Sequence, residues 1–495
     1  MEREQYLGAG SRLEGGPADT LAAAAFAHEL RAAPYLWKGL GHADLAHLAM
    51  LAEAGIVSRA DGAVILDAVA DVLALDPADA GLDPSRGDVY NNRDHLLAER
   101  IADRAGLIHT GRARREATTI AWQLAVRERL LRLGAAAAAL LGALVSVAET
   151  HRATLMPDFT YLQHAHPTTL GHYLLGFAHP VRRDLDRLER ALALVNRSPA
   201  GSGSVNGSRF PLDRSLGADV LECDGLVEHT RDAMWATDMV IEPMAAALAL
   251  MITVDRLAED LQIWCTEEFG FVELDDAHSR TSVVMPQKKN PYALTHLRGT
   301  ARMLVGTFAG LAGTMLTPSG QPDNRVFAYE LVPASLDRAA EAVELAADVL
   351  ARAGFDRDRL AAAAASGYPY ATDLCDVLVL EAGIDNRTAH RVVGRAVRAA
   401  LEAGGAPVDA AAVRAAAADL AVTLPDVPDE EVDAVRDPQA IVATRRTVGG
   451  AGAEPMEAML HSLGEAARGA AGFWGDHPLH GFDERIASRV RRLVS

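Results

Sequence analysis

The chain has 495 residues, of which 49% are hydrophobic and 23% are charged, and its formal net charge is −19 at pH 7. This length exceeds the roughly 250 to 300 residues that one hydrophobic core usually serves, so we expect two or three domains. The negative charge, without an evident basic patch, argues against nucleic acid or an anionic membrane as a partner, because both would repel the chain.

The cysteines and the first residues bear on the compartment. Cys223, Cys265 and Cys375 are widely spaced and form no Cys-x-x-Cys pair. This usage is typical of a reducing cytoplasm and not of a disulfide framework or a zinc site. Residues 1–5 carry charges of both signs and do not resemble a signal peptide. We therefore expect a cytoplasmic protein without a metal or another cofactor.

Helical periodicity dominates the chain, and strand patterns are scarce. The pattern predicts an all-α fold around a long antiparallel helix bundle. Its most apolar stretch, residues 133–148, falls short of the roughly 20 residues that a bilayer span needs, which indicates a buried helix. In chain order, the long helices are predicted at residues 118–149, 170–195 with a kink at Pro180, 239–267, 291–316 and 333–353.

One helical segment suggests burial between subunits. Residues 244–251, Met-Ala-Ala-Ala-Leu-Ala-Leu-Met, are apolar on all sides, as expected when a helix is buried by other subunits as well as its own. Domain boundaries are expected near Gly111 and Ala365. We predict an N-terminal helical domain over residues 1–111, a central long-helix domain over residues 112–365 and a C-terminal helical domain over residues 366–495.

Residues 279–291, Ser-Arg-Thr-Ser-Val-Val-Met-Pro-Gln-Lys-Lys-Asn-Pro, carry the clearest chemical signal. Removing a proton from the carbon beside a carboxylate builds a doubly charged aci-carboxylate. Such a site needs a mobile oxygen base, a fixed cation and hydrogen-bond donors. Ser282, Lys288 and Asn290 offer all three, which indicates elimination chemistry. Asn290 and Pro291 also suit an ordinary helix start, with the asparagine as N-cap.

Several short motifs follow one another in a fixed order along the chain. They are His109-Thr110-Gly111-Arg112, Met156-Pro157 with Thr160 and Gln163, Gly171-His172-Tyr173, Ser198-Pro199 with Gly201, Met285-Pro286-Gln287-Lys288-Lys289-Asn290-Pro291 and Thr447-Val448-Gly449-Gly450. This series resembles the fumarase/aspartase superfamily, and most closely its argininosuccinate lyase branch. The resemblance covers most of the chain. It implies a three-domain helical fold, a small dicarboxylate substrate, and a homotetramer whose active sites are shared between subunits.

The resemblance also implies roles for single residues. Ser282 aligns with the serine taken to remove the Cβ proton, and its power as a base depends on loop closure. Lys288 and Asn290 would hold the carboxylate beside the carbon that loses the proton. Residues 201–207 would shape a tight loop facing the substrate. The further substrate-binding candidates, which also have ordinary structural interpretations, are Thr160, Arg114, His109, Arg115 and Gln163.

The chain departs from the family pattern on the side of the leaving group. The family has a histidine where this chain has Tyr161, and the glutamate that pairs with that histidine is Thr295 here. Because both halves of the pair are missing together, we expect a different acid or leaving group. Tyr161 is a candidate acid, since a phenol can protonate a basic departing amine. His164 and His166 are rival candidates.

These patterns predict a lyase that splits a C–N bond in an N-substituted aspartate through an aci-carboxylate and releases fumarate. The missing pair favours a specialised substrate over argininosuccinate itself. Two alternatives stay open: a catalytically quiet, crystallin-like structural or binding relative, and an ammonia-lyase of the aspartase type. The retained loop speaks against a quiet relative, because such a protein has no physical need for a lysine aimed into an acidic interior.

Overall fold

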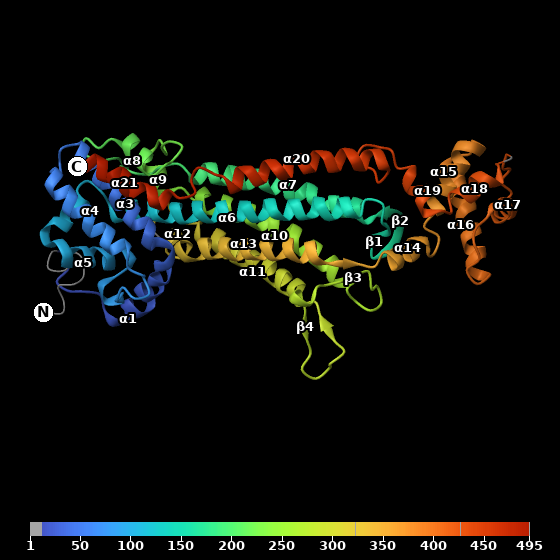
Figure 1. The fold of residues 1–495 in the computed structure, drawn as a ribbon, viewed down its shortest axis with the longest axis horizontal. Coiled ribbons are helices and arrows are strands. Elements are labelled where there is room, and N and C mark those ends of the chain that lie inside the picture. The colour runs from blue at the N-terminus through green and yellow to red at the C-terminus, as the bar shows by residue number, and fades with distance from the viewer. Residues whose placement is uncertain (1–11, 322, 426, 495) are drawn as a thin grey trace.

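The computed structural model describes residues 12–321, 323–425 and 427–494. The expectation about residues 1–5 lies outside these ranges. Within them the protein is mostly helical and elongated, a rod of long helices with a smaller helical group at each end (Figure 1). The predicted all-α fold is therefore confirmed.

Long helices that lie side by side form the rod. All five long helices predicted from periodicity occur among the described residues, and Pro180 lies inside the second of them. The largest difference is at the last one, which begins at Ala328 instead of at Pro333. The five helices are α6 (Arg114–Thr150), α7 (Leu170–Val195), α10 (Asp238–Trp264), α11 (Tyr292–Thr314) and α13 (Ala328–Arg352).

Helix α6 is the central element of the rod. It has 37 residues, a length of about 55 Å at 1.5 Å per residue. By length and composition alone it could cross a membrane, but it packs against α13, α7, α3 (Ala33–Glu53) and α20 (Ala453–Gly475). Leu133 and Leu144 are fully buried. Helix α6 is therefore the buried helix that residues 133–148 predict.

Shorter helices form the group at the N-terminal end of the rod. Residues 19–32 make a broken helix in which a π-helical turn interrupts α-helical turns. Ser58 and Asp88 cap later helices, each by accepting a hydrogen bond from a backbone N–H. Besides α3, the elements of this group are α1 (Asp19–Leu21), η1 (Ala22–Phe26), α2 (Ala27–Glu29), η2 (Leu30–Ala32), α4 (Arg59–Leu73), η3 (Pro84–Arg86), α5 (Val89–Ile101) and η4 (Ala102–His109).

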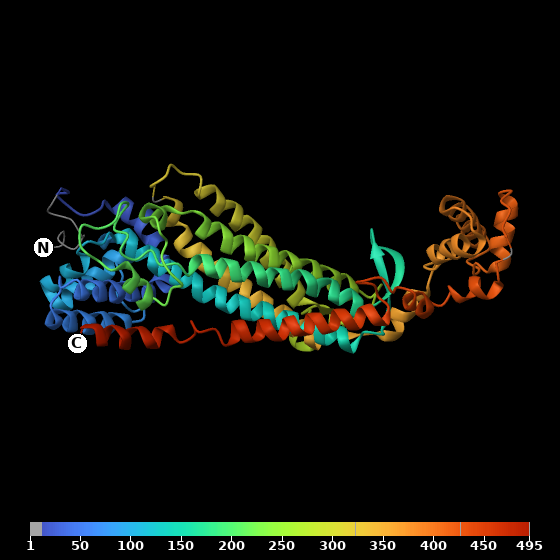
Figure 2. The ribbon, with the colours of Figure 1, turned by 90° about the horizontal axis from the view of Figure 1, so that it is seen from above.

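The other end of the rod carries a second hydrophobic core, formed between Tyr370 and Ile441. The chain then returns, because α20 packs along α6 and α7, and α21 (Phe482–Val494) packs against α3 and α4 (Figure 2). The division at residues 111 and 365 stays a prediction, and we propose one change, that residues 453–494 belong with the rod and the N-terminal group. The helices of the second core are α15 (Ala371–Ala382), α16 (Asn386–Glu402), α17 (Ala410–Asp419), α18 (Asp429–Ala434) and α19 (Pro438–Ala443).

Strands are short and pair antiparallel in the described parts of the chain. β1 (Leu155–Thr160) and β2 (Gln163–Thr169) form a hairpin. Its turn residues, Tyr161 and Leu162, have φ angles of 56° and 57°, which match the twist of a two-residue hairpin turn. The remaining pairs and helices are β3 (Val272–Glu273) with β6 (Gly354–Phe355), β4 (Arg280–Thr281) with β5 (Lys289–Asn290), α8 (Arg214–Val220), α9 (Thr230–Trp235), η5 (Asp276–His278), α12 (Asp323–Val326) and α14 (Arg357–Ala365).

Candidate functional site

The loop that carries Ser282 and Lys288 is an arm, residues 279–290, that projects from the side of the rod (Figure 1). The hydroxyl of Ser282 accepts a hydrogen bond of 3.0 Å from the backbone N–H of Met285. One donor that would stabilise a serine oxyanion is therefore already in place. Val283 and Val284 at the tip are 102% and 84% exposed. Exposed apolar side chains that lie together are typical of a surface that contacts another one.

Short strands and charges hold the base of the arm. The side-chain amide of Asn290 donates to the carbonyl of Arg280 at 2.8 Å, across the β4–β5 pair. The Lys289 ammonium lies 3.0 Å from Glu273 and 2.8 Å from Asp276. Its hydrogen bonds to these carboxylates raise the pKa of Lys289. The predicted N-cap role of Asn290 is wrong, because α11 begins at Tyr292 and Asn290 belongs to β5.

The hairpin carries the residues predicted from the Met-Pro segment. Thr160 pairs with Gln163 across the end of the hairpin. Between them, Tyr161 is 98% exposed in a left-handed conformation. For a residue other than glycine this conformation costs about 1 to 2 kcal/mol, and such strain is often found at functional sites. Of the two rival acids, His164 lies 3.4 Å from the hydroxyl of Ser366 and His166 is exposed.

His109 and Arg114 lie at the opposite end of α6 from the hairpin. The Nε2 atom of His109 is 2.6 Å from a carboxylate oxygen of Asp94, and its Nδ1 atom is 2.7 Å from the hydroxyl of Tyr90. Arg114 is half exposed and lies 3.3 Å from Asp88. These contacts leave the outer face of the Arg114 guanidinium accessible to an anionic group.

Arg115, the next residue of α6, contacts two other segments. Its guanidinium donates to the side-chain oxygen of Asn324 at 3.2 Å and to the carbonyl of Met234 at 3.4 Å. It also stacks on the ring of Trp235, 4.1 Å from the ring centroid. Arg115 therefore links the start of α6 to the segments around α9 and α12.

Beneath these residues lies a buried ion cluster formed by Asp44, Arg93 and Arg112. Asp44 accepts hydrogen bonds of 3.1 Å from Arg93 and 2.7 Å from Arg112. Burial alone would raise the pKa of Asp44, but the charges of the two arginines outweigh it and hold that pKa below its ordinary value. The cluster fixes the N-terminal helices against the start of α6, since Asp44 lies on α3, Arg93 on α5 and Arg112 just before α6.

Glu116, in the first turn of α6, holds the glycine loop of residues 201–207. Its two carboxylate oxygens accept hydrogen bonds of 2.7 Å from the backbone N–H of Gly201 and 2.6 Å from that of Gly203. Any side chain at Gly203 would meet the carbonyl oxygen of Gly207 at 2.6 Å. Burial raises the pKa of Glu116 to about 7. Sequence spacing does not reveal this role of Glu116, because its partners lie 85 and 87 residues further along the chain.

A second acid that sequence spacing does not reveal is Glu29, at the end of α2. Burial raises its pKa to about 7, and the nearby charge of Asp88 adds to this rise, while Arg114 opposes it. A carboxyl group with such a pKa can carry a proton near neutral pH. A π-helical turn, Ala22–Phe26, interrupts the helix shortly before Glu29. Such a backbone irregularity is frequent at functional sites, so the structure marks this segment where the sequence pattern does not.

The predicted residues form three separate groups in one chain. His109, Arg114 and Arg115 lie at the N-terminal end of α6, and the Thr160 hairpin follows its C-terminal end (Figure 1). The length of α6, about 55 Å, separates these two groups. The arm leaves the rod between them. One chain alone does not bring the predicted residues together, and no group of three or more His, Cys, Asp or Glu in its described parts is arranged to hold a metal ion.

Similarity to known proteins identifies the family to which this chain belongs. Residues 15–306 match the family described as Lyase, and residues 368–443 match the family described as Argininosuccinate lyase C-terminal. The argininosuccinate lyase of Methanoculleus marisnigri is 37% identical over 84% of this chain and 85% of its own length. That of Natronomonas pharaonis is 38% identical over 92% of this chain and 90% of its own. This chain belongs to the argininosuccinate lyase family. The predicted resemblance is therefore confirmed, and the protein is a carbon–nitrogen lyase.

Solved structures agree with membership of the argininosuccinate lyase family. An EDDS lyase variant with bound fumarate is 27% identical, with a TM-score of 0.87 over 97% of this chain and 99% of that chain. A class II fumarase from Schistosoma mansoni is 14% identical, with a TM-score of 0.70 over 85% of this chain and 92% of that chain. The second likeness shows that the fumarase/aspartase fold is shared.

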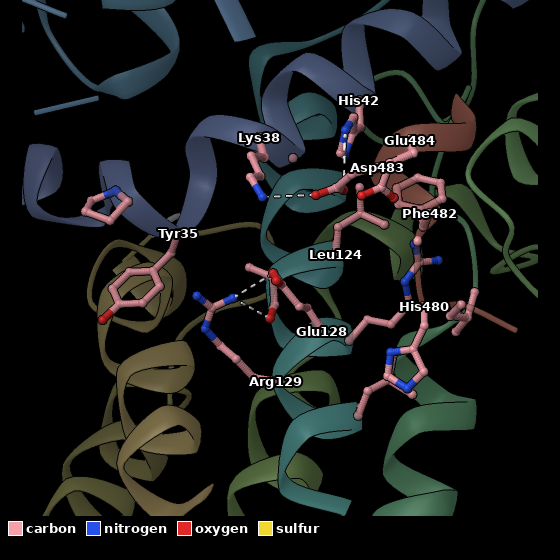
Figure 3. Close-up of a pocket in the computed structure, with 17 residues that line it drawn as sticks. Tyr35, Lys38, His42, Leu124, Glu128, Arg129, His480, Phe482, Asp483 and Glu484 are labelled. Carbon is pink, nitrogen blue, oxygen red and sulfur yellow. Dashed lines mark hydrogen bonds and ion pairs between the residues drawn. The ribbon is translucent and has the colours of Figure 1, made fainter. Parts of the chain in front are cut away.

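This argininosuccinate lyase family member also has a pocket of about 290 Å³ away from the predicted residues (Figure 3). It lies between α3, α6 and the start of α21. Lys38 and His42 both face Asp483, with distances of 3.1 Å and 3.6 Å to its carboxylate oxygens. The Arg127 guanidinium stacks on Phe482 at 4.5 Å. The polar side chains of this pocket dock the C-terminal helix onto the N-terminal group.

Proposed function

We propose that this protein is a homotetrameric lyase that splits the C–N bond of an N-substituted aspartate and releases fumarate. The observation that carries the proposal is the arm, which retains Ser282, Lys288 and Asn290 in one exposed segment next to a prepared donor, the Met285 N–H. The relatives named argininosuccinate lyase and the EDDS lyase structure with bound fumarate support it. The three free thiols suit a cytoplasmic location.

The proposed reaction begins at the arm. The Ser282 oxyanion removes a proton from Cβ of the substrate, and Lys288 and Asn290 stabilise the negative charge that collects on the adjacent carboxylate. The electron pair of that carbanion then forms the Cα–Cβ double bond as the C–N bond breaks. The departing amine takes a proton from Tyr161, and fumarate remains. No redox partner is needed.

Complete sites require neighbouring subunits in this proposal. Because α6 separates the hairpin from the N-terminal group by about 55 Å, a neighbour that runs antiparallel would supply what one chain lacks. Ile252 on α10 and Met303 and Val305 on α11 are 47%, 66% and 49% exposed. Such large apolar side chains on the long helices favour burial between subunits. Thr160, Gln163, His109, Arg114 and Arg115 would then line one shared site for the dicarboxylate.

Subunit mixing tests the shared site. Ser282→Ala and Arg114→Ala should each be nearly inactive alone, because each removes one contribution from every site. Unfolding the two variants together and refolding them should restore activity, since some sites then combine an intact arm with an intact Arg114. Refolding each variant separately is the control. A mixture no more active than its components would contradict shared sites.

The substrate is tested by following fumarate absorbance with argininosuccinate and a panel of other N-substituted aspartates. We expect a specialised substrate to react faster than argininosuccinate, because Tyr161 and Thr295 replace the family's acid pair. Silence across the whole panel would count against the proposal. Ammonia release from free aspartate would favour the aspartase-type alternative. A Ser282→Ala variant with every measured property unchanged would favour the quiet structural relative.

A further inference from the structure

His278 lies at the junction between the rod and the arm. It is the last residue of η5 and is 7% exposed, although the arm that follows is largely exposed. Its Nε2 atom is 2.9 Å from a carboxylate oxygen of Asp348 on α13. The other oxygen of Asp348 accepts a hydrogen bond of 3.0 Å from Arg352, one turn further along α13. A histidine at the start of the arm is thus tied to a helix of the rod.

The protonation of the imidazole follows from these contacts. A carboxylate accepts hydrogen bonds, so Nε2 of His278 carries a proton and donates it to Asp348. This hydrogen bond is the largest of the interactions that lower the pKa of Asp348. In the described part of the chain, the buried Nδ1 atom of His278 has no hydrogen-bond partner. The ring therefore keeps its place in spite of an unsatisfied atom, which makes the bond to Asp348 the polar contact that orients it.

The rest of the base of the arm is built around the same point. One strand of the arm begins two residues after His278, and the other is fixed by Lys289, which pairs with Asp276 in the same 3₁₀ turn as His278. On the rod side, Val349 and Leu350 next to Asp348 are buried in the hydrophobic core. A rotation of the turn at His278 would therefore carry both strands, and the tip with Ser282, in a new direction.

We propose that His278 is a positioning residue, whose bond to Asp348 sets the direction of the arm and thereby the place at which Ser282 meets the substrate. This inference rests on the proposed function, because it assumes that Ser282 is the base. Geometry at the reacting atoms has a steep effect on rate, so a small change in direction at the base has a large effect at the tip. His278 itself touches neither substrate nor reacting atoms.

Matched substitutions separate the hydrogen bond from the bulk of the ring. His278→Leu fills the space without a donor, and His278→Gln retains an amide N–H near the position of Nε2. The control is His461→Leu, which breaks a histidine–glutamate pair that is 72% and 62% exposed on α20. We expect His278→Leu to lower kcat about tenfold or more with KM changed less than about twofold. His278→Gln should recover most of kcat, and His461→Leu should match the wild type.

Asp348 offers an independent check. If the bond acts as a unit, Asp348→Asn should also lower kcat, and the double variant His278→Leu with Asp348→Asn should be no slower than the slower single variant. A merely structural role would lower the melting temperature without a change in kcat per folded site. Wild-type kcat in His278→Leu, or equal slowness of His278→Gln and His278→Leu, would overturn the inference.

The outcome is distinguishable from failure of the proposed function. If Ser282→Ala is as active as the wild type, the proposed function fails, whatever His278 does. Hydrogen exchange of the arm amides in substrate-free protein then judges the positioning role without any assay of activity. His278→Leu should speed exchange between residues 280 and 290 and His278→Gln should not. Unchanged exchange in His278→Leu would overturn the role of the bond in orienting the arm.

Discussion

Two regions of this molecule carry chemistry in opposite ways. At the start of α6, Asp44, Arg93 and Arg112 are each less than 8% exposed and directly bonded. On the arm, Lys288 is exposed and Ser282 has only a local contact to the backbone. The first region is assembled inside one chain, and the second, in the proposed function, is completed by a neighbouring subunit. The comparison teaches that the buried cluster gets its contacts from the fold of one chain, while the proposed base, Ser282, stands on an exposed arm.

The largest expected effect tests the arm, residues 279–290. Ser282→Ala should lower kcat by about three orders of magnitude or more, because the substitution removes the oxygen proposed to take the Cβ proton. Steady-state fumarate release measures it. Ser279→Ala is the matched control, since that hydroxyl only donates to the carbonyl of Asp275. A loss of less than tenfold would break the comparison, since the arm would then not carry the base.

The next largest effect tests the buried cluster of Asp44, Arg93 and Arg112. Asp44→Ala leaves two buried guanidinium groups without their shared carboxylate, so the free energy of unfolding should fall by about 3 to 5 kcal/mol. Urea denaturation followed by circular dichroism measures the loss. Asp67→Ala is the control, because its pair with Arg491 is 64% and 63% exposed and should change stability by less than about 0.5 kcal/mol. Equal losses would show that burial of the cluster adds nothing.

The sequence predicted the long helices and the chemical motif of residues 279–291 for different reasons. Residues 118–149 and 239–267 repeat apolar residues at helical spacing, so local pattern alone locates α6 and α10. Ser282, Lys288 and Asn290 stand within one short segment, so their motif is readable without the fold. The start of α11 was harder, because Asn290 and Pro291 satisfy the usual N-cap pattern while the backbone there pairs as a strand.

The missed residues depend on contacts that sequence spacing does not reveal. The carboxylate of Asp44 meets Arg112 across 68 residues, and His278 meets Asp348 across 70. Glu116 and Glu29 look like ordinary helix-surface acids until packing removes water from them. Their significance comes from burial, which is a property of the assembled helices and not of any one helix.

The dependence of stability on pH tests a second buried group near the start of α6, His47. Burial lowers the pKa of His47 from 6.5 to about 3, so in this window the unfolded chain binds a proton that the folded protein does not. The contribution of His47 to the free energy of unfolding should therefore fall as the pH falls through this window, by about 1.4 kcal/mol per pH unit. His47→Gln keeps a donor for the carbonyl of Thr110 and removes the titration, so its slope should be smaller. Urea unfolding at several pH values measures both slopes, and equal slopes would contradict the assignment.

The smallest effect concerns the charges at the base of the arm. Lys289→Met removes pairs with Glu273 and Asp276, which are 79% and 96% exposed. Exposed pairs contribute little, so stability should change by less than about 0.5 kcal/mol. Thermal unfolding measures it, with Lys38→Met as a control at the other end of the rod. A loss above about 2 kcal/mol would show that the arm is fixed as firmly as the buried cluster.

The return of α20 along the rod turns the second core into an insertion. The chain leaves the rod through α14 and comes back after α19, and both connectors contact the hairpin that carries Thr160. Because both ends of this inserted segment join the rod at neighbouring positions, the segment can be deleted or replaced without a change in the topology of the rest of the protein. A displacement of residues 366–443 would act on the β1–β2 hairpin through α14 and α19. A domain grafted in their place would therefore be coupled to the residues around Tyr161.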